Sequence, residues 1–289
     1  MSKNVKIGLL FMLGVFSLIG MVFTAVFLGM QFGLFNVRGS ILERNAFFTK
    51  GSSSQSASVT ASVPSQPCVE LSQKVCAWNE TPQWQVVAGG LLKDVSIIER
   101  VASETGVSSR LIASVVVPEQ IRFFTSEREV FKRYFEPLKI LGSLSQFSLG
   151  VSGIKQETAV QIEQYANDPT SPFYPGDGYG KLLVYAPGAD HDKELYNRLT
   201  DAKNHYYSYL YTAIYIREIQ MQWNRAGYPL VTKPEIIGTL FNIGFQGSHP
   251  NAAPQVAGAS ITTGGTSYTF GELGGLFYDS RELLSAIPR

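Results

Sequence analysis

Two segments of the chain decide the fold: residues 108–124, SSRLIASVVVPEQIRFF, and residues 147–159, FSLGVSGIKQETA. The first segment begins with serines that can cap a helix, and its apolar residues are dense enough to bury one. Pro118 lies near the end of this run. Because proline removes a backbone donor, we expect the helix to kink or stop around Glu119.

Glu119 is the candidate catalytic residue. It lies at the expected helix end with Ile121, Phe123 and Phe124 close behind it, so we expect its carboxyl group to be poorly solvated. Desolvation raises the pKa of a carboxyl group and keeps it protonated nearer neutral pH, as a general acid requires. The alternative is an ordinary surface glutamate at a helix end.

The second segment is a glycine-punctuated turn followed by a new helix start. Gly150 and Gly153 permit positive φ or a close approach of the backbone to another group. We expect the side chain of Gln156 to face a ligand that lies over this turn. The alternative is that Gln156 is an ordinary polar residue at the start of a helix. Between the two segments, residues 126–141 predict a further helix with a capping-box pattern at its start.

The rest of the chain lacks the alternating strands and helices of a parallel sheet, so the predicted fold class is mainly α. The expected helices cover residues 91–102 with a stop at Gly106, residues 201–225, residues 233–245 with Pro234 in the first turn, and residues 280–287. The expected loops cover residues 167–192 and 246–268.

The charge pattern limits the classes of partner. The net charge is +1 over 289 residues, which argues against a nucleic-acid-binding surface.

The histidines are scattered and the cysteines lack metal-ligand spacing, so no metal and no cofactor are expected. The acidic loop residues Asp177, Asp190 and Asp192 are expected to be solvated, with calcium binding as the alternative. Glu157 and Glu163 are predicted to be solvated helix residues, and Glu157 is the alternative second acid.

The N-terminal segment predicts a membrane anchor. Residues 7–30 carry no charge, and at ~1.5 Å per residue a helix of this length spans a hydrocarbon core of ~30 Å. Lys3 and Lys6 precede the run, which favours an N-terminus in the cytoplasm. We therefore expect an uncleaved anchor with the following residues outside the cytoplasm; a cleaved signal peptide is the alternative.

The expected organisation has three parts. Residues 1–30 form the cytoplasmic stub and anchor, residues 31–67 form a juxtamembrane segment and a Ser-rich flexible linker, and residues 68–289 form the globular domain. Cys68 and Cys76 follow the linker directly. Outside the cytoplasm they can form a short-loop disulfide, and two reduced buried thiols are the alternative.

Residues 105–120, TGVSSRLIASVVVPEQ, resemble the first motif of the lysozyme-like lytic transglycosylases, where a small-residue turn leads into an apolar helix ending in the catalytic glutamate. Residues 153–156, GIKQ, followed by Thr-Ala, are similar to the G-L-M-Q motif of that family and its trailing T-A. Residues 204–219 resemble its N-x-x-x-G-x-x-Y-L helix loosely, and residues 241–244, FNIG, resemble its Y-N-x-G motif. The order and placement of the motifs match that family.

The sequence departs from the family pattern at several positions. Gln120 follows the glutamate where the family usually has serine, Lys155 replaces the usual methionine, and Phe241 replaces the usual tyrosine. The interval between Glu119 and Gly153 also contains the extra predicted helix. These differences concern the geometry of the cleft more than the identity of the acid.

The resemblance implies a lysozyme-like helical domain that cleaves the bond between N-acetylmuramic acid and N-acetylglucosamine in peptidoglycan glycan strands. Glu119 would protonate the glycosidic oxygen and then, as a base, draw the proton from the muramoyl C6 hydroxyl. The product would be a 1,6-anhydro sugar. Gly153, Ile154, Gln156, Asn242 and Gly244 would bind the glycan, and for Asn242 support of a loop is the alternative.

The resemblance also implies a location and partners. The domain would lie on the periplasmic side of a bacterial cytoplasmic membrane, with the lipid bilayer and the cell wall as partners and an envelope assembly as a further candidate. A hydrolytic lysozyme is one alternative, and a non-catalytic glycan-binding component of such an assembly is another. The tyrosines of residues 206–215 would stack on sugars or pack in the core.

Overall fold

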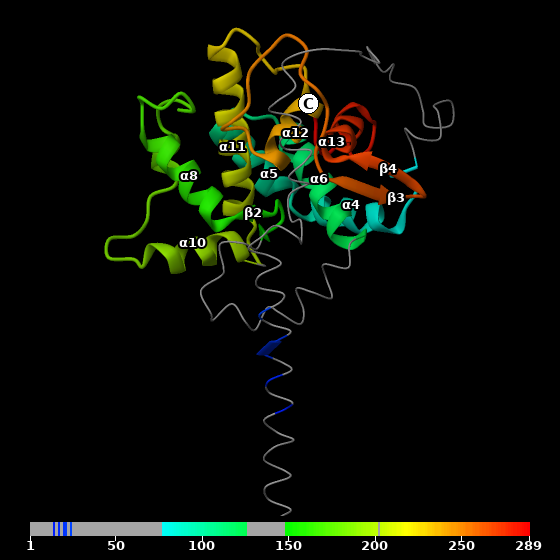
Figure 1. The fold of residues 1–289 in the computed structure, drawn as a ribbon, viewed down its shortest axis with the longest axis horizontal. Helices are drawn as coiled ribbons and strands as arrows, with labels where there is room; N and C mark the ends of the chain where they lie inside the picture. The colour runs from blue at the N-terminus through cyan, green and yellow to red at the C-terminus, as the bar shows by residue number, and fades with distance from the viewer. Residues whose placement is uncertain are drawn as a thin grey trace, which may run out of the picture.

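The helix of residues Ser109–Thr125, α6, contacts α4, α5, α11, α12, α13 and strand β3, so most of the domain packs on it (Figure 1). The computed structural model describes residues 77–125, 148–201 and 203–289, together with five positions between residues 14 and 24. Helices dominate these residues, which confirms the prediction of a mainly α protein.

The helices surround α6 on several sides. In chain order the others are α4 (Pro82–Lys93), α5 (Val95–Thr105), α8 (Gln156–Asn167), α9 (Tyr179–Leu182), α10 (His191–Thr200), α11 (Tyr206–Arg225), α12 (Pro234–Ile243) and α13 (Phe270–Asp279). In Figure 1, α8 and α10 lie on one side of the domain and α4 on the other.

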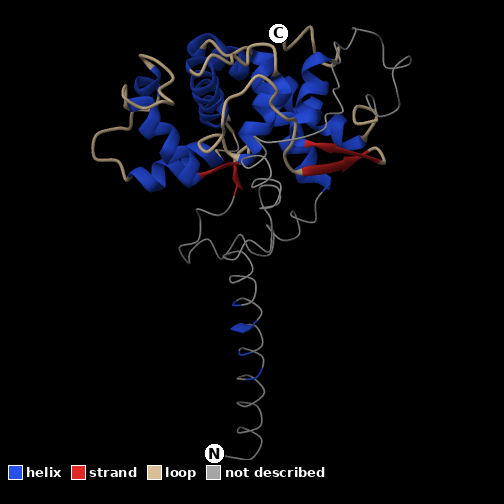
Figure 2. Ribbon diagram, turned by 45° about the horizontal axis from the view of Figure 1, so that its top comes forward, coloured by secondary structure: helices blue, strands red, loops and turns tan. Residues whose placement is uncertain are grey.

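Two short antiparallel hairpins complete the described part of the chain (Figure 2). The first pairs β1 (Ser148–Leu149) with β2 (Ile154–Lys155), and the second pairs β3 (Ser260–Thr263) with β4 (Thr266–Thr269). The first hairpin leads directly into α8, so the turn between its strands is anchored close to the start of that helix.

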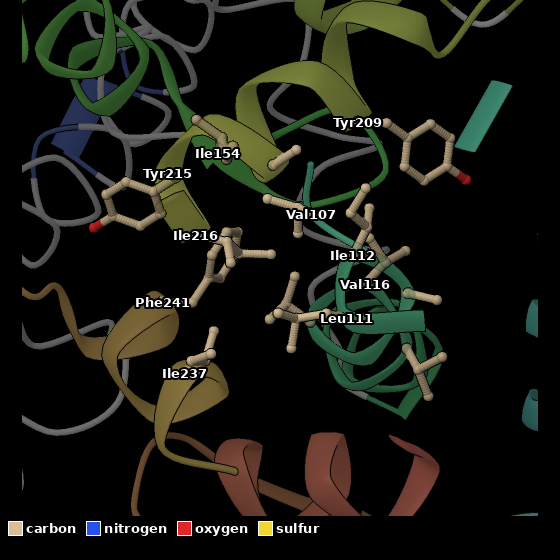
Figure 3. Close-up of a cluster of buried hydrophobic side chains, with 14 of the residues drawn as sticks. Val107, Leu111, Ile112, Val116, Ile154, Tyr209, Tyr215, Ile216, Ile237 and Phe241 are labelled. Carbon is tan, nitrogen blue, oxygen red and sulfur yellow. The ribbon is translucent and has the colours of Figure 1, made fainter. Parts of the chain in front are cut away.

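The core lies where α6 faces α11 and α12. Leu111, Ile112 and Val116 of α6 are buried, and Ile216 of α11 and Ile237 of α12 belong to the same hydrophobic cluster (Figure 3). All five side chains are less than a tenth exposed. Burial of this apolar surface at ~25 cal/mol per Å2 is the main term that stabilises the helix packing.

Helix α6 does not stop at Glu119, as the sequence led us to expect; it continues to Thr125 with Pro118 inside it. A proline cannot donate to the carbonyl four residues earlier, which here belongs to Ser114. Gly274 of α13 packs against that carbonyl, because a Cβ at Gly274 would lie 2.6 Å from the Ser114 oxygen. The backbone of α13 therefore lies close to α6 at the proline turn, and α6 keeps its helical course through Pro118.

Other expected boundaries are confirmed or corrected by the structure. Gly106 ends α5 in the left-handed conformation at φ 67°, and Pro234 begins α12, both as predicted. The expected helix at residues 91–102 is divided at Asp94, which separates α4 from α5.

The C-terminal predictions were wrong in two places. Residues 246–268 contain β3 and most of β4 rather than a loop alone, and the last helix is α13 rather than residues 280–287. Thr269 and Glu272 form a capping box that starts α13, and Ser280 ends it. This threonine–glutamate spacing is the sequence signal that would have placed the helix.

Several predictions fall on residues outside the described ranges. These are most of the anchor at residues 7–30, the linker, the Cys68–Cys76 disulfide and the helix at residues 126–141. Within the described residues, none of the helices is both long enough and apolar enough to cross a membrane.

Arg110 ties the start of α6 to the C-terminal segment. Its guanidinium group is fully buried and donates hydrogen bonds to backbone carbonyls of Phe277, Tyr278, Ser280, Glu282 and Ile287. A buried guanidinium is stable only when its donors are satisfied, and here the last turn of α13 and the segment that follows it satisfy them. Arg110 thereby fixes residues 277–287 against α6.

We predict that Arg110→Met lowers the free energy of unfolding by roughly 3–5 kcal/mol, because it leaves several buried carbonyls without a donor. Arg110→Lys should recover part of the loss, since an ammonium group supplies fewer donors in a different geometry. Denaturant titration of the full-length protein measures both. Arg100→Met is the matched control, because Arg100 is 62% exposed and makes surface contacts with Glu104 of the same helix and the Tyr206 ring; an equal loss in both methionine variants would contradict the prediction.

Candidate active site

A pocket of about 340 Å3, open to solvent at its mouth, lies where α6, the first hairpin, α8, α11, α12 and α13 meet. Its lining side chains come from segments far apart in the sequence: Glu119, Arg122, Ser152, Gly153, Ile154, Thr158, Tyr215, Phe241, Asn242 and Phe270. The lining mixes aromatic, polar and charged groups, as small-ligand sites do.

Glu119 projects into this pocket from the middle of α6. Its side chain is 15% exposed, so the carboxyl group is largely removed from solvent. Its surroundings are not purely apolar, contrary to the sequence-based expectation, because Nη1 of Arg122 lies 3.6 Å from its Oε2. Arg122 is one helical turn further on, where a side chain three residues away shares the same face.

The turn between β1 and β2 closes tightly over Glu119. Gly153 has φ 66°, and a Cβ there would lie closer than 3.0 Å to three atoms of the Glu119 side chain. Gly150 has φ 65° at the other end of the turn and approaches the carbonyl of Leu199 and the hydroxyl of Ser208. Both predicted glycine roles are therefore present, with positive φ and close backbone approach at the same residues.

Gln120 holds this turn in place. Its Nε2 donates a hydrogen bond to the backbone carbonyl of Val151, and the backbone N–H of Val151 donates to Oγ of Ser208 at 3.1 Å. The residue after Glu119 therefore connects α6 to the turn that packs on the carboxyl group. Its amide side chain is long enough to bridge this gap, which gives the unexpected glutamine a positioning role.

Asn242 lies in the pocket and also supports a loop. Its Oδ1 accepts a hydrogen bond from the backbone N–H of Ala259 at 2.8 Å, which leaves the Nδ2 donors for other groups. The position of Asn242 is thus compatible with both expectations, binding of a glycan and support of a loop. Ile154 is buried beside it, and Thr158 of α8 completes the polar edge of the lining.

Four of the six predicted site residues come together in the pocket, and two do not. Glu119, Gly153, Ile154 and Asn242 line it. Gln156 is half-buried at the first position of α8, and Gly244 ends α12 with φ 89°. Neither of these two is a lining residue.

Six lining residues were not among the predicted site residues: Arg122, Ser152, Thr158, Tyr215, Phe241 and Phe270. Arg122 follows Glu119 on α6, and the rings of Tyr215 and Phe270 join Phe241 in an aromatic wall. The Tyr215 and Phe241 centroids are 5.2 Å apart, and those of Phe241 and Phe270 are 6.5 Å apart. The three-residue spacing of Glu119 and Arg122 was a visible signal; the ring cluster depends on tertiary packing.

Glu163 is not the solvated residue that the sequence suggested. Its carboxylate accepts hydrogen bonds from the hydroxyls of Tyr185 and Tyr211, and it pairs with Nε2 of His191 at 2.7 Å. The hydrogen bond to Glu163 raises the pKa of His191. These contacts connect α8, the loop before α10, α10 and α11 outside the pocket.

The other predicted charged groups lie at the surface. Glu157 has a half-exposed side chain and pairs with Lys155 at 3.7 Å, in keeping with its predicted solvated position. Asp190 caps α10 through the N–H of Lys193, and Asp177 accepts from the hydroxyl of Tyr174. Over the described ranges, no group of three or more potential metal ligands is present.

Glu218 on α11 is a buried acid that the sequence analysis did not single out. Its side chain is fully buried, and within the described part of the chain neither carboxyl oxygen has a hydrogen-bond partner. Burial raises the pKa of Glu218 well above 4.5, the ordinary value. Glu218 does not line the pocket, so its neutral form is a feature of the core rather than of this site.

Comparison with protein-family models, curated proteins and solved structures gave no match to this chain.

We predict that Gly153→Ala displaces the Glu119 side chain and lowers the stability of the fold. Gly106→Ala is the matched control: φ is 67° there against 66° at Gly153, but no atom lies within 4 Å of the added Cβ. Both variants carry the same backbone strain, so the difference between them isolates the contact with Glu119. Chemical denaturation should show a loss at Gly153 larger by ~1–3 kcal/mol; equal losses would mean that the turn does not pack on the carboxyl group.

We predict that Glu218→Gln stabilises the protein at pH 8 and not at pH 4.5. The folded-state pKa of Glu218 is raised, so its contribution to stability is full below the unfolded value and is lost as pH rises towards the folded value. Each pKa unit corresponds to about 1.4 kcal/mol. Thermal unfolding of both proteins at the two pH values measures the difference, and the exposed Glu157→Gln is the control. A gain that is the same at both pH values would refute the assignment.

Proposed function

We propose that this chain is a peptidoglycan lytic transglycosylase with a lysozyme-like domain, in which Glu119 acts as general acid and then as base. The supporting observation is that Gly153 packs on the carboxyl group of Glu119 while Asn242 lines the same pocket. These residues belong to three separate segments, each of which resembles a motif of that family. Their convergence is what a shared catalytic cleft requires.

The proposed reaction needs one carboxyl group. Glu119 supplies the only carboxyl among the described lining residues of the pocket. Glycosidases that use two carboxylates place the second where it can attack the sugar or activate water. In the proposed reaction, Glu119 gives its proton to the glycosidic oxygen and the muramoyl C6 hydroxyl attacks C1. Glu119 then takes the proton of that hydroxyl, and the 1,6-anhydro ring closes without an added water.

The remaining lining residues suit a sugar. Phe241 keeps some exposed ring surface for the C–H side of a sugar ring, and the buried rings of Tyr215 and Phe270 pack against it. Asn242 retains amide donors for an acetamido carbonyl, since its oxygen is taken by Ala259. The pocket is open to solvent on one side, so a longer strand can extend beyond it.

The location belongs to the same proposal. Residues 7–30 would anchor the protein in the bacterial cytoplasmic membrane, and the linker would carry the domain towards the cell wall. Glycan strands and the bilayer are then the expected partners.

A non-catalytic glycan-binding protein is the second candidate function, and one contact favours it. Arg122 lies 3.6 Å from Glu119. An ion pair of this kind also suits a site that binds glycan without cleaving it, because both charged groups can then serve as hydrogen-bonding groups for the sugar.

We predict that Glu119→Gln reduces cleavage of purified peptidoglycan at least ~100-fold, because the amide cannot transfer a proton. Mass spectrometry of digests made with the full-length protein should show 1,6-anhydromuramoyl ends for the wild type. Glu99→Gln, an exposed glutamate of α5, is the control for the substitution itself.

Each other outcome selects an alternative. Reducing ends alone would identify a hydrolytic lysozyme. Equal glycan binding by wild type and Glu119→Gln without turnover in either would identify a binding protein. A comparable loss in Glu157→Gln would indicate a mechanism with two carboxyl groups.

A further inference from the structure

Two of the three histidines pair with carboxylates that belong to other elements of the fold. Nε2 of His191, the first residue of α10, lies 2.7 Å from Oε2 of Glu163 in α8. Nδ1 of His205, the residue before α11, lies 2.6 Å from Oδ2 of Asp94, which separates α4 from α5. The two pairs therefore fasten the beginning of α10 and the beginning of α11 to their neighbours.

The side chains around His191 come from α8, α10, α11 and the loop before α10. Nδ1 of His191 lies 3.5 Å from the exposed carboxylate of Asp192, and its ring packs on that of Tyr185 with centroids 4.6 Å apart. The other charged or titratable groups of this cluster are Glu163, Glu194, Arg198 and Tyr211. Glu163 is the closest of the carboxylates, so it contributes most to the protonated form of His191.

The side chains around His205 come from α5, α11 and the residues that precede these helices. The hydroxyl of Tyr209 donates to the same oxygen of Asp94 at 2.8 Å. The other charged groups of these elements are Lys93, Arg100, Glu104 and Asp201. The side chains of His205 and Asp94 are 28% and 14% exposed, so solvent screens their contact less than that of a surface pair.

Both pairs favour the charged form of the imidazole ring. The hydrogen bond to Glu163 raises the pKa of His191 above its ordinary value of 6.5, and the hydrogen bond to Asp94 does the same for the pKa of His205. Because the folded-state pKa is the higher one, the stabilisation is fully present below pH 6.5 and is lost as pH rises through the folded value. A neutral ring can still donate one hydrogen bond, but that bond is weaker than a charged one.

Helix α10 and the first turn of α11 support the turn between β1 and β2. A Cβ at Gly150 would lie 2.4 Å from the carbonyl oxygen of Leu199, in the last turn of α10, and 2.4 Å from Oγ of Ser208, in the first turn of α11. The N–H of Val151 donates to the same Oγ at 3.1 Å. The turn in question also packs on Glu119. A shift of α10 or of the start of α11 therefore reaches the pocket through this turn.

We propose that His191 and His205 form a pH-sensitive clamp, which in its protonated form holds α10 and the start of α11 in place and on deprotonation loosens the turn that packs on Glu119. The clamp operates from about pH 6.5 upwards, so the pocket is most rigid in mildly acidic surroundings. This inference goes beyond the proposed function, because it concerns the turn and stands whether or not the chain cleaves glycan.

The test measures hydrogen exchange of the Val151 amide in the full-length protein at pH 5.5 and pH 8.0, with rates corrected for the pH dependence of exchange in an unfolded peptide. We expect the protection of this amide in the wild type to be lower at pH 8.0 by about fivefold or more. The amide of Gly271, which donates to the carbonyl of Ala257 at the start of α13, is the internal reference for opening of the whole fold. Its protection should change by less than about twofold.

The double variant His191→Gln/His205→Gln keeps a hydrogen-bond donor at both positions but cannot be charged. Its Val151 amide should be less protected than that of the wild type at pH 5.5 and should respond to pH by less than about twofold. His249→Gln is the matched control, because the third histidine is exposed in the loop after α12. It should keep the full response of the wild type.

A second measurement needs only the wild type. The ring signals of His191 and His205 are followed by NMR as pH is raised. Both rings should titrate above pH 6.5, and the loss of Val151 protection should have the same midpoint as one of them.

The opposite results are as clear. Equal protection of the Val151 amide at both pH values overturns the inference, and so does a loss whose midpoint matches neither histidine. A response that persists in the double variant assigns the effect to other groups, and an equal loss at Gly271 shows that the whole fold opens rather than the turn. None of these measurements uses a substrate, so their failure and the failure of the proposed function are separate results.

Discussion

The close contact between the Gly153 backbone and the Glu119 carboxyl group is the constraint on which the site depends. It requires a residue without a Cβ at a positive φ in the turn. It also requires α6 to remain helical at Glu119, so that the carboxyl group lies beside that turn. Gln120 connects the next position of α6 to the carbonyl of Val151 in the same turn. Glu119 and Gln120, two adjacent residues of α6, therefore both contact the turn between β1 and β2. These contacts set the position of that turn at the edge of the pocket.

Helix α6 can impose that arrangement because it is held both at its start and in its middle. At its start, Arg110 is bound by the carbonyls of the C-terminal segment. In its middle, Gly274 of α13 lies against the Ser114 carbonyl at the proline turn. A buried helix with contacts on so many sides has little freedom to shift, so the side chains that it carries into the pocket are preorganised.

The sequence predicted the parts of this arrangement that local chemistry determines. The serine start of α6, the stop at Gly106 and the positive φ of Gly150 and Gly153 each follow from the residue type at one position. The continuation of α6 past Pro118 did not, because proline locally favours a helix end whereas the segments that pack on α6 are far away in the chain. The same holds for the candidate site. Glu119 and the glycines were readable as a pattern, whereas the aromatic wall exists only because α11, α12 and α13 pack together.

The relation between Glu119 and Arg122 decides how the site should be understood. A lone acid in an apolar pocket was the expectation from sequence. The structure instead places the guanidinium group of Arg122 3.6 Å from the carboxyl group of Glu119 in the same pocket. The two side chains meet because residues three positions apart share one face of a helix. The surroundings of Glu119 therefore depend on its own helix as well as on the turn that packs against it, and both are parts of the chain whose local pattern could be read in advance.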